Sequence, residues 1–506
     1  MSILTAIRHP IRAWQARQRR RAMELFQRYH AASFNHLTGG WSGGMRNNNL
    51  LISASSQIVR ERTRDLVRNF PPFARAVDAY AAFVVGRGSR FQSLALTPDG
   101  EADKKTRQKI ESRFRSWMDE ADVAKKLHFY ELQQLACRQF LENGEWLGRM
   151  VTPRARGRHL LAVQMHDAED LSSWKAADMG QGASIMDGVE YDPVTAEALA
   201  YHFQRIPEMG GQYETWREEA CNVLHCFKVL RPGQLRGISP FAAAILLAKD
   251  MQDYMSAELG SAKMAARWLG IVTSDDVETA QMARLGGGMG GMAGKADANR
   301  LEEIPVAMME YLKTGEDVKF APPSARPGDS FDRFTSFSLR MVSILVSIRY
   351  EVLSGDYKEL NYSVSKASRN DDTQLLIPHR FRLEQHFIRP VFYRWLDCEA
   401  LTQDYLPGYF ADPARYRLSM NIPAGSPSVD PLRDGKADID AINSKLKSPQ
   451  QVIMSNGDDP EEVLEQHRQW LELCEEKGVD PASITSINTN LASNPAKLGA
   501  EEFNNE

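Results

Sequence analysis

The chain has 506 residues and a formal net charge of −4 at pH 7; 43% of its residues are apolar and 25% are charged. This balance is typical of soluble globular protein, and the length suits about three domains. The negative charge argues against a tight nucleic-acid binder, because such proteins carry a marked basic excess, although it leaves room for brief contact with DNA.

Membrane insertion and secretion are both disfavoured. No apolar run approaches the ~20 residues that a membrane helix requires. The sequence has five cysteines, an odd and sparse set, and no apolar secretion signal at its start. We therefore expect assembly in a reducing cytoplasm, without structural disulfides.

Residues 1–54 form the first predicted part, a basic arm followed by a linker. Arginines at positions 12, 17 and 19–21 alternate with apolar residues that include Trp14 and Phe26, and a Gly/Asn-rich stretch follows at 39–49. This composition predicts a hinge between the arm and the body. The arginines suit DNA, an anionic surface or a partner, but a solvated helix face docked through Trp14 and Phe26 is the simpler interpretation.

Residues 55–238 mix helical and strand-like patterns, which predicts an α+β body. The helical patterns cover residues 76–85, 106–119 and 130–141, and the strand-like runs cover 146–152 and 198–204.

Two long helices are predicted at 239–268 and 329–350. The first opens on Ser239-Pro240, a capping residue with proline at the first helical position. A surface helix commonly has one polar stripe, but two such helices in one chain favour the lining of a channel. The candidate lining residues are Lys249, Asp253, Lys263, Arg267, Arg333 and Arg340. The second helix is expected to pack through Phe334, Phe337, Met341, Ile344 and Ile348, and to keep Ser336, Ser343 and Ser347 wet with its arginines.

The segment between these helices, 269–328, carries strand-like runs at 271–273 and 318–320 around a glycine-rich run at 286–294. Gly294-Lys295 is reminiscent of a phosphate-binding loop, but Met289 and Ala296 stand where that motif requires glycine and a hydroxyl residue. The sequence therefore predicts no nucleotide site here.

We find no other set of residues with catalytic or metal-binding logic. Cys221 and Cys226 lack the second pair of ligands that a zinc site requires and indicate a buried strand. The acids around His166 have no companion motif and favour a turn. We expect no catalytic residue, no metal and no cofactor.

After the second long helix, residues 351–363 predict an exposed loop between rigid supports. A further helix is expected at about 365–396, kinked or interrupted by Pro378 and Pro390. Beyond it, two amphipathic helices are predicted at 431–446 and 460–477, the second capped by Asp459 with Glu462 as its reciprocal acid. The polar, Asn-rich residues 481–506 are expected to be disordered.

Four segments, in order, resemble the lambda-type portal proteins of tailed bacteriophages. They are Asp65-Leu-Val-Arg-Asn69 with Val84-Val-Gly-Arg-Gly88; Asp187-Gly-Val-Glu-Tyr-Asp192 with Ala200-Tyr-His202; His225-Cys-Phe-Lys-Val-Leu-Arg-Pro-Gly-Gln-Leu-Arg-Gly-Ile-Ser-Pro240; and Leu353-Ser-Gly-Asp-Tyr with Asn361-Tyr-Ser363. Relatives tend to have arginine where this chain has Lys366, which keeps the charge but lacks the planar fork.

The resemblance implies a portal fold with a wing, a two-helix stem, a small β-containing clip and a helical crown. The implied parts are an arm (1–54), a wing in two pieces (55–238 and 364–428), two stem helices (239–268 and 329–350), a clip (269–328), a tunnel loop (351–363), a crown (429–480) and a tail (481–506).

The implied function is a homo-oligomeric ring, a dodecamer, at one capsid vertex of the virion, assembled in the host cytoplasm. Double-stranded DNA would pass through it without sequence readout during packaging and ejection. The implied partners are the terminase large subunit, the head-tail adaptor, and the major capsid and scaffolding proteins. The residues assigned to the DNA path are Tyr357, Lys358, Asn361, Tyr362 and Lys366. For the two tyrosines, a role in locking the turn stays open, and a DNA-processing nuclease is the alternative function.

Overall fold

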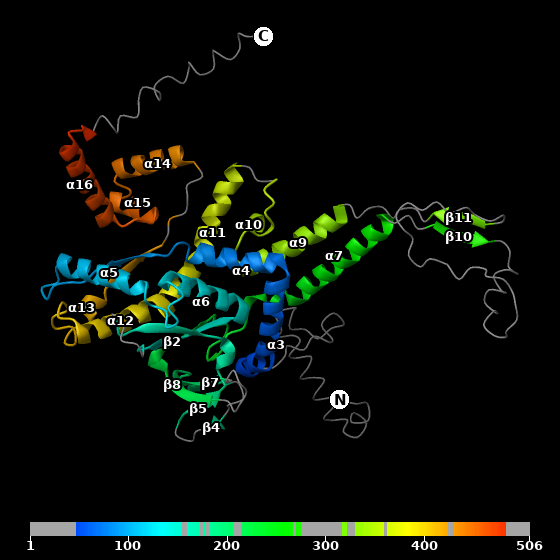
Figure 1. Ribbon diagram of the computed structural model, residues 1–506, viewed down its shortest axis with the longest axis horizontal. Helices are drawn as coiled ribbons and strands as arrows, with labels where there is room; N and C mark the ends of the chain where they lie inside the picture. The colour runs from blue at the N-terminus through cyan, green and yellow to red at the C-terminus, as the bar shows by residue number, and fades with distance from the viewer. Residues whose placement is uncertain are drawn as a thin grey trace, which may run out of the picture. The chain divides into compact units, whose positions relative to one another are not determined.

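The computed structural model describes residues 47–153, 159–172, 177–178, 182–205, 214–266, 270–274, 316–320, 329–358, 362–423, 425 and 430–481. The predicted arm, glycine-rich run and polar tail lie outside these residues. The chain divides into Met1–Leu51 and Ile52–Glu506, and the contacts given below lie within the second unit. Helices and antiparallel sheets both occur (Figure 1), so the predicted α+β class is confirmed.

The main core lies among helices α3 (Asn48–Asn69), α4 (Pro71–Val84), α5 (Lys104–Met118), α6 (Phe129–Asn143) and α12 (Arg389–Thr402). The starts of α5 and α6 are fixed by capping residues: Asp103 caps α5 by accepting a hydrogen bond from the Thr106 amide, and His128 and Glu131 form a capping box on α6. Fully buried aromatic rings fill the space between the helices. They include Phe73, Phe114, Trp117, Phe129, Phe140, Phe387, Phe392 and Trp395.

A buried ion cluster joins the two sequence-distant parts of this core. The Glu399 carboxylate on α12 accepts hydrogen bonds from Arg113 on α5 and from the Tyr405 hydroxyl, the latter at 3.0 Å. It also lies 3.2 Å from Nδ1 of His159. Burial alone would raise the pKa of Glu399, but the bonds from His159 and Arg113 reverse the effect and hold it at about 2. The carboxylate is therefore charged at neutral pH and ties α12 to α5.

Three antiparallel sheets complete the body. The first has the order β3-β2-β9, from β2 (Glu145–Val151), β3 (Ala162–His166) and β9 (Val223–Phe227); Leu147 pairs with both His166 and His225. The second runs in sequence order and comprises β4 (Ala177–Asp178), β5 (Ser184–Met186), β6 (Val189–Tyr191), β7 (Ala198–Arg205) and β8 (Glu214–Glu219). The third pairs β1 (Arg90–Ser93) with β12 (Ser419–Ile422) and brings the distant segments together again.

Two long helices, α7 (Ile245–Ala266) and α9 (Asp329–Val346), lie side by side (Figure 1). The two predicted strands occur as β10 (Gly270–Ser274) and β11 (Glu316–Phe320), which lie between these helices in the chain and form an antiparallel pair. Ser239 caps a 3-10 turn, Pro240–Ala243, and α7 begins only at Ile245, so the predicted start at residue 239 is early.

The second predicted helix, 329–350, is too long. Ser347 has a left-handed backbone (φ 55°), and the Ile348 amide donates back to the Ser343 carbonyl at 3.1 Å, a closing pattern typical of helix C-termini. A separate short helix, α10 (Tyr350–Ser354), follows. The predicted loop at 351–363 is therefore shorter, because its first residues are helical and α11 (Tyr362–Leu383) includes its last two.

Pro378 lies inside α11, and the chain continues through a π-helical segment, Glu384–Ile388, into α12, where Pro390 occupies the first turn. The π segment accommodates the irregularity that the two prolines predicted. After α13 (Ala414–Arg417), three helices form the C-terminal part rather than the two predicted: α14 (Pro431–Asn443), α15 (Pro449–Ser455) and α16 (Pro460–Lys477).

Asp459 caps α16 as predicted, by accepting from the Glu461 amide. The prediction that Glu462 completes this cap as the reciprocal acid is wrong, because its carboxylate accepts a hydrogen bond from Arg90 at 2.7 Å instead. This contact and the 3.1 Å ion pair between Arg90 and Asp458 attach α16 to β1. None of the helices in the described ranges has the length and apolar character needed to cross a bilayer.

Candidate functional site

The loop between α10 and α11 holds the first two predicted site residues. Gly355 ends α10 with φ 72°, a conformation that favours glycine, and donates its amide to the Glu351 carbonyl. Asp356 then accepts from the Lys358 amide at 3.2 Å in a tight turn. Tyr357 is 56% exposed and Lys358 is also exposed, so both are available to a ligand.

The start of this loop is fixed by contacts to three other helices. Arg349, just before α10, forms a 2.5 Å ion pair with Asp372 of α11. The Tyr350 hydroxyl donates to Ser336 of α9 at 3.2 Å, and Arg75 of α4 donates to the Val352 carbonyl at 3.3 Å. The exposed residues therefore follow a rigid support, as the sequence predicted.

Helix α11 is held along its second half against α4. The Tyr80 hydroxyl and Nδ1 of His379 lie 2.8 Å apart, and Arg380 donates to the Phe83 carbonyl at 2.8 Å. Burial, followed by the charges of Arg382 and Lys228, lowers the pKa of His379 to about 4, so this histidine is neutral at pH 7. Tyr362 and Lys366 lie in the N-terminal part of this helix, and Asn361 lies outside the described residues.

The predicted lining residues of the helix pair are exposed where the structure describes them. Lys249 and Asp253 form a 2.7 Å ion pair along α7, and Lys263 and Arg333 are also exposed. Arg340 is exposed too, but its guanidinium lies over the Tyr350 ring at 5.1 Å. Arg267 lies outside the described residues. The two helices meet through aromatic contacts of Tyr254 with Phe331 and Phe334, at centroid distances of 5.7 and 5.0 Å.

Helix α9 has two apolar faces. One packs inside the chain, with Leu339, Val342 and Val346 all buried. The other carries Phe337, Met341 and Ile344, which lie about 170° away on the helical wheel. Phe337 is 53% exposed and Ile344 is 68% exposed.

The predicted packing stripe of α9 is therefore divided. Phe334 contacts Tyr254 and Ile348 is buried, whereas Phe337, Met341 and Ile344 are exposed. Ser343, predicted to stay wet, is buried and donates to the Arg340 carbonyl at 2.7 Å. That assignment is wrong because Ser343 stands beside Leu339 and Val342 on the packed face.

Sequence reasoning missed a buried hub around Glu145. Its carboxylate accepts from Nη2 of Arg236 at 2.6 Å and from the Gly237 amide at 2.8 Å, and lies 3.1 Å from Nε2 of His225. Burial opposes the charged form, but Arg236 and His225 hold the pKa of Glu145 below its usual range. All three of these partners lie in the segment 225–240, so this segment acts structurally in the subunit.

Beside this hub, two positions require glycine because the backbone segments around them lie very close together. Gly144 has φ 87°, and a Cβ added to it would lie 2.0 Å from the carbonyl carbon of Ile238. A Cβ on Gly237 would lie 2.2 Å from the Gly144 oxygen. The two backbones approach too closely for any side chain.

The acids around His166 form a structural cluster. Arg64 donates to Asp167 and, at 2.8 Å, to Glu169, while Nδ1 of His166 lies 2.9 Å from Asp170. Within the described ranges no group of three His, Cys, Asp or Glu side chains has the arrangement of a metal site. Cys226 is buried on β9 as predicted, whereas Cys221 is exposed before that strand. The Gly294-Lys295 segment lies outside the described residues.

Comparisons with known proteins agree on one family. A sequence model described as "Phage portal protein, lambda family" matches residues 34–377. The chain is 24% identical over 489 residues to the probable portal protein of Halomonas phage phiHAP-1, with 91% of each chain covered. It is 22% identical over 444 residues to portal protein B of Escherichia phage lambda, with 80% of this chain and 81% of the relative covered. A solved chain from the neck of a native gene transfer agent particle, computed with C12 symmetry, is 14% identical and aligns with a TM-score of 0.42, covering 79% of this chain and 94% of that chain.

Proposed function

The chain belongs to the lambda family of phage portal proteins, and we propose that its copies form a ring at one capsid vertex, through which double-stranded DNA is packaged and ejected. The observation that carries the ring is the second apolar face of α9. Phe337, Met341 and Ile344 are exposed in the subunit although the opposite face of the same helix is buried. An uncovered apolar stripe on a rigid helix is typical of a surface that packs against a partner.

We propose that the ring has twelve subunits, the number that the family resemblance implies. Twelve copies with a formal charge of −4 each carry −48 in total. This charge repels phosphates at long range and keeps a moving duplex from adhering to the ring.

We assign the wing, stem, clip and crown of the subunit by analogy with the family. The wing comprises the core and sheets up to residue 238 together with residues 364–428, and the paired β1 and β12 support this joint assignment. Helices α7 and α9 form the stem, and residues 269–328 form the clip that meets the terminase motor and later the head-tail adaptor. Helices α14–α16 form the crown. The major capsid and scaffolding proteins contact the outside of the ring in the virion.

The loop after α10 and the start of α11 face the DNA in this proposal, through Tyr357, Lys358, Asn361, Tyr362 and Lys366. The exposure of Tyr357 supports this role over a role in locking the turn. Lys249, Asp253, Lys263, Arg267, Arg333 and Arg340 line the stem. Contacts of this kind reach the phosphate backbone and not the base edges, so they permit sliding.

Replacing Phe337 by aspartate tests the ring. The side chain is half exposed in the subunit, so folding should be retained, but assembly would bury an unpaired charge at a cost of several kcal/mol. We expect monomers with an unchanged circular dichroism spectrum, whereas Val194→Asp, at a 90% exposed turn position, should still form rings. Normal rings of Phe337→Asp by mass photometry would contradict the assignment of this face.

The DNA path has a separate test. The variant with both Lys358→Ala and Asn361→Ala should form rings with nearly unchanged thermal stability. Lys358 is exposed, and substitutions of exposed residues usually shift stability by less than about 0.5 kcal/mol. Capsids containing this variant should package or retain less DNA than capsids with the parent protein. Equal packaging and retention would remove the loop from the DNA path.

The chain itself does not hydrolyse nucleotide in this proposal, and the motor is a separate protein. Purified rings should show no ATP turnover above background. Turnover that Lys295→Ala abolishes would contradict this assignment.

A further inference from the structure

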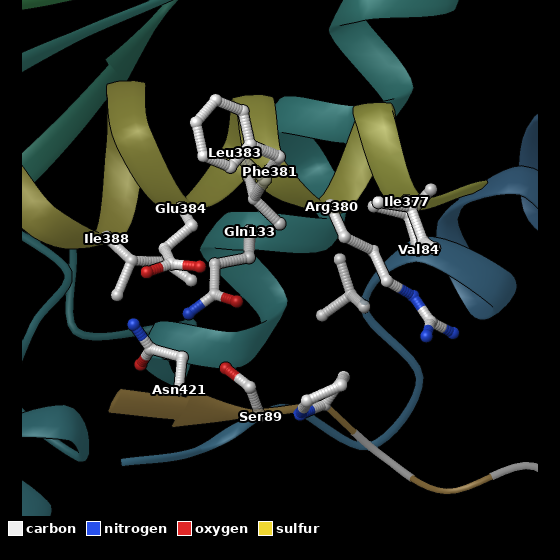
Figure 2. A pocket seen from close by; sticks show the side chains of 12 residues that line it. Val84, Ser89, Gln133, Ile377, Arg380, Phe381, Leu383, Glu384, Ile388 and Asn421 are labelled. Atoms are coloured by element: carbon white, nitrogen blue, oxygen red, sulfur yellow. The ribbon is translucent and has the colours of Figure 1, made fainter. Parts of the chain in front are cut away.

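A cavity of about 250 Å³ lies beside α11 (Figure 2). Its apolar lining includes Val84 at the end of α4, Ile377 and Phe381 of α11, and Ile388 of the π-helical segment. Ile377 and Phe381 are exposed, so a small molecule can enter from solvent. An engineered cavity of roughly 150 Å³ is enough to hold benzene, so this one has room for about ten non-hydrogen atoms.

One polar side chain in the wall of this cavity is buried without a partner. Gln133 of α6 is only 2% exposed, and its side-chain amide makes no hydrogen bond to any residue that the structure describes. The other two glutamines of α6 are satisfied, because Gln134 and Gln139 donate to the carbonyls of Gly86 and His166, both at 2.9 Å. A buried amide without a partner is destabilising, so in native proteins such a group usually meets water or a ligand.

Gln133 stands at a position that packing alone would give to an apolar residue. Its neighbours one turn away on the same face of α6, Phe129, Ala136 and Cys137, are all buried. The Gln133 amide is directed into the cavity, where the Ser89 hydroxyl and the Asn421 amide face the same space (Figure 2). Those two side chains also lack a hydrogen-bond partner within the described part of the chain. Three unpartnered polar groups therefore converge on one region of the cavity.

The charged groups in the wall of the cavity balance each other. Arg380 donates to the Phe83 carbonyl at 2.8 Å, and the Glu384 carboxylate lies 3.2 Å from Nη2 of Arg389. One cation and one anion line the cavity, which leaves its wall without net charge. A charged ligand would lose its hydration there without meeting a wall of opposite sign, so the cavity favours a neutral ligand.

Water alone suits only part of this cavity, because water needs several polar partners and apolar cavities stay dry. We propose that the cavity binds a small neutral molecule with an apolar body and an amide head. The body packs against Val84, Ile377 and Ile388, and the head exchanges hydrogen bonds with Gln133 and Asn421. An amide head is complementary to these side chains, because each of the three groups both donates and accepts. The site lies within one subunit, so it does not depend on the proposed ring.

Benzamide tests the site, because it combines a ring of suitable size with an uncharged amide. Its binding to the purified full-length protein is measured by titration with ligand-observed NMR. We expect benzamide to bind more tightly than toluene, which lacks the amide, and than benzoate or benzylamine, which carry a charge. Gln133→Leu should weaken benzamide binding about tenfold, the effect of losing one net hydrogen bond, and should leave toluene binding equal or stronger.

Gln108→Leu is the matched control, because Gln108 is exposed on α5 and away from the cavity lining, and this variant should bind benzamide like the parent. The thermal midpoint of ligand-free Gln133→Leu should be unchanged or higher, since the substitution removes a buried amide without a partner. A large fall of that midpoint, the absence of saturable benzamide binding, or binding that Gln133→Leu does not weaken would overturn the site. Tighter binding of benzoate or benzylamine would overturn the neutral class of ligand.

Discussion

Replacing Arg236 by methionine should destabilise the subunit by about 3–5 kcal/mol, the usual cost of removing one partner from a buried ion pair. Arg236 and Glu145 are both almost completely buried, and the guanidinium also donates to the carbonyls of Asp187 at 2.6 Å and Ala168 at 2.9 Å. Methionine fills much of the same volume, so the loss does not arise from a cavity. It arises from the two unsatisfied carbonyls and from the buried Glu145 carboxylate, which loses its closest cation and keeps only the Gly237 amide, His225 and Arg60 at 3.8 Å.

Urea unfolding followed by tryptophan fluorescence measures the effect, since Trp146 adjoins Glu145 in β2. Arg468→Met is the matched control, because Arg468 pairs with Glu465 on the surface of α16, where exposed ion pairs contribute little to stability. Adding Glu145→Gln to Arg236→Met should recover part of the loss, because the buried charge is then gone. A loss below about 1 kcal/mol for Arg236→Met would refute the view that this hub stabilises the wing.

Two further predictions concern the body of the subunit. Burial raises the pKa of Glu111 to about 7, with repulsion from Asp459 and Glu461 adding to it and the hydrogen bond from the Ser93 amide and the charge of Arg115 opposing it. The contribution of this group to stability is therefore complete below about pH 4.5 and is lost as the pH rises to 7. Hydrogen exchange in α16 should quicken over that window beyond its intrinsic pH dependence, and Glu111→Gln should remove the extra dependence. Gly144→Ala should prevent soluble expression or lower the thermal midpoint strongly, because the new Cβ would collide with the backbone of Ile238. Gly100→Ala is the control: Gly100 also has a positive φ (84°), but nothing lies within 4 Å of the added Cβ, so the change should cost only about 1 kcal/mol. Equal effects of the two substitutions would contradict the close approach of the two backbones.

Local signals in the sequence predicted much of the fold. The helix start at Asp459-Pro460 is where the sequence predicted it, whereas Ser239-Pro240 caps a 3-10 turn that precedes α7. The strands at 271–273 and 318–320 were visible as short apolar runs and form one antiparallel pair. These features depend on neighbours in the chain, so composition and spacing suffice to find them.

Features that depend on distant residues could not be predicted. In this hub Glu145 contacts residues that lie 80 to 92 positions further along the chain, and no local sequence pattern predicts such a pairing. Ser347 adopts a left-handed conformation without being glycine, because its position lets Ile348 enter the core. The divided apolar stripe of α9 was visible as apolar spacing, but spacing does not tell which face the subunit covers itself.

Electron microscopy of the purified full-length protein tests the central claim most directly. We expect rings with a central hole, twelve subunits around it, the exposed stripe of α9 covered by a neighbour, and the loop at Tyr357 and Lys358 at the edge of the hole. Separate monomers at all concentrations, or rings in which that loop lies on the outer rim, would contradict the account.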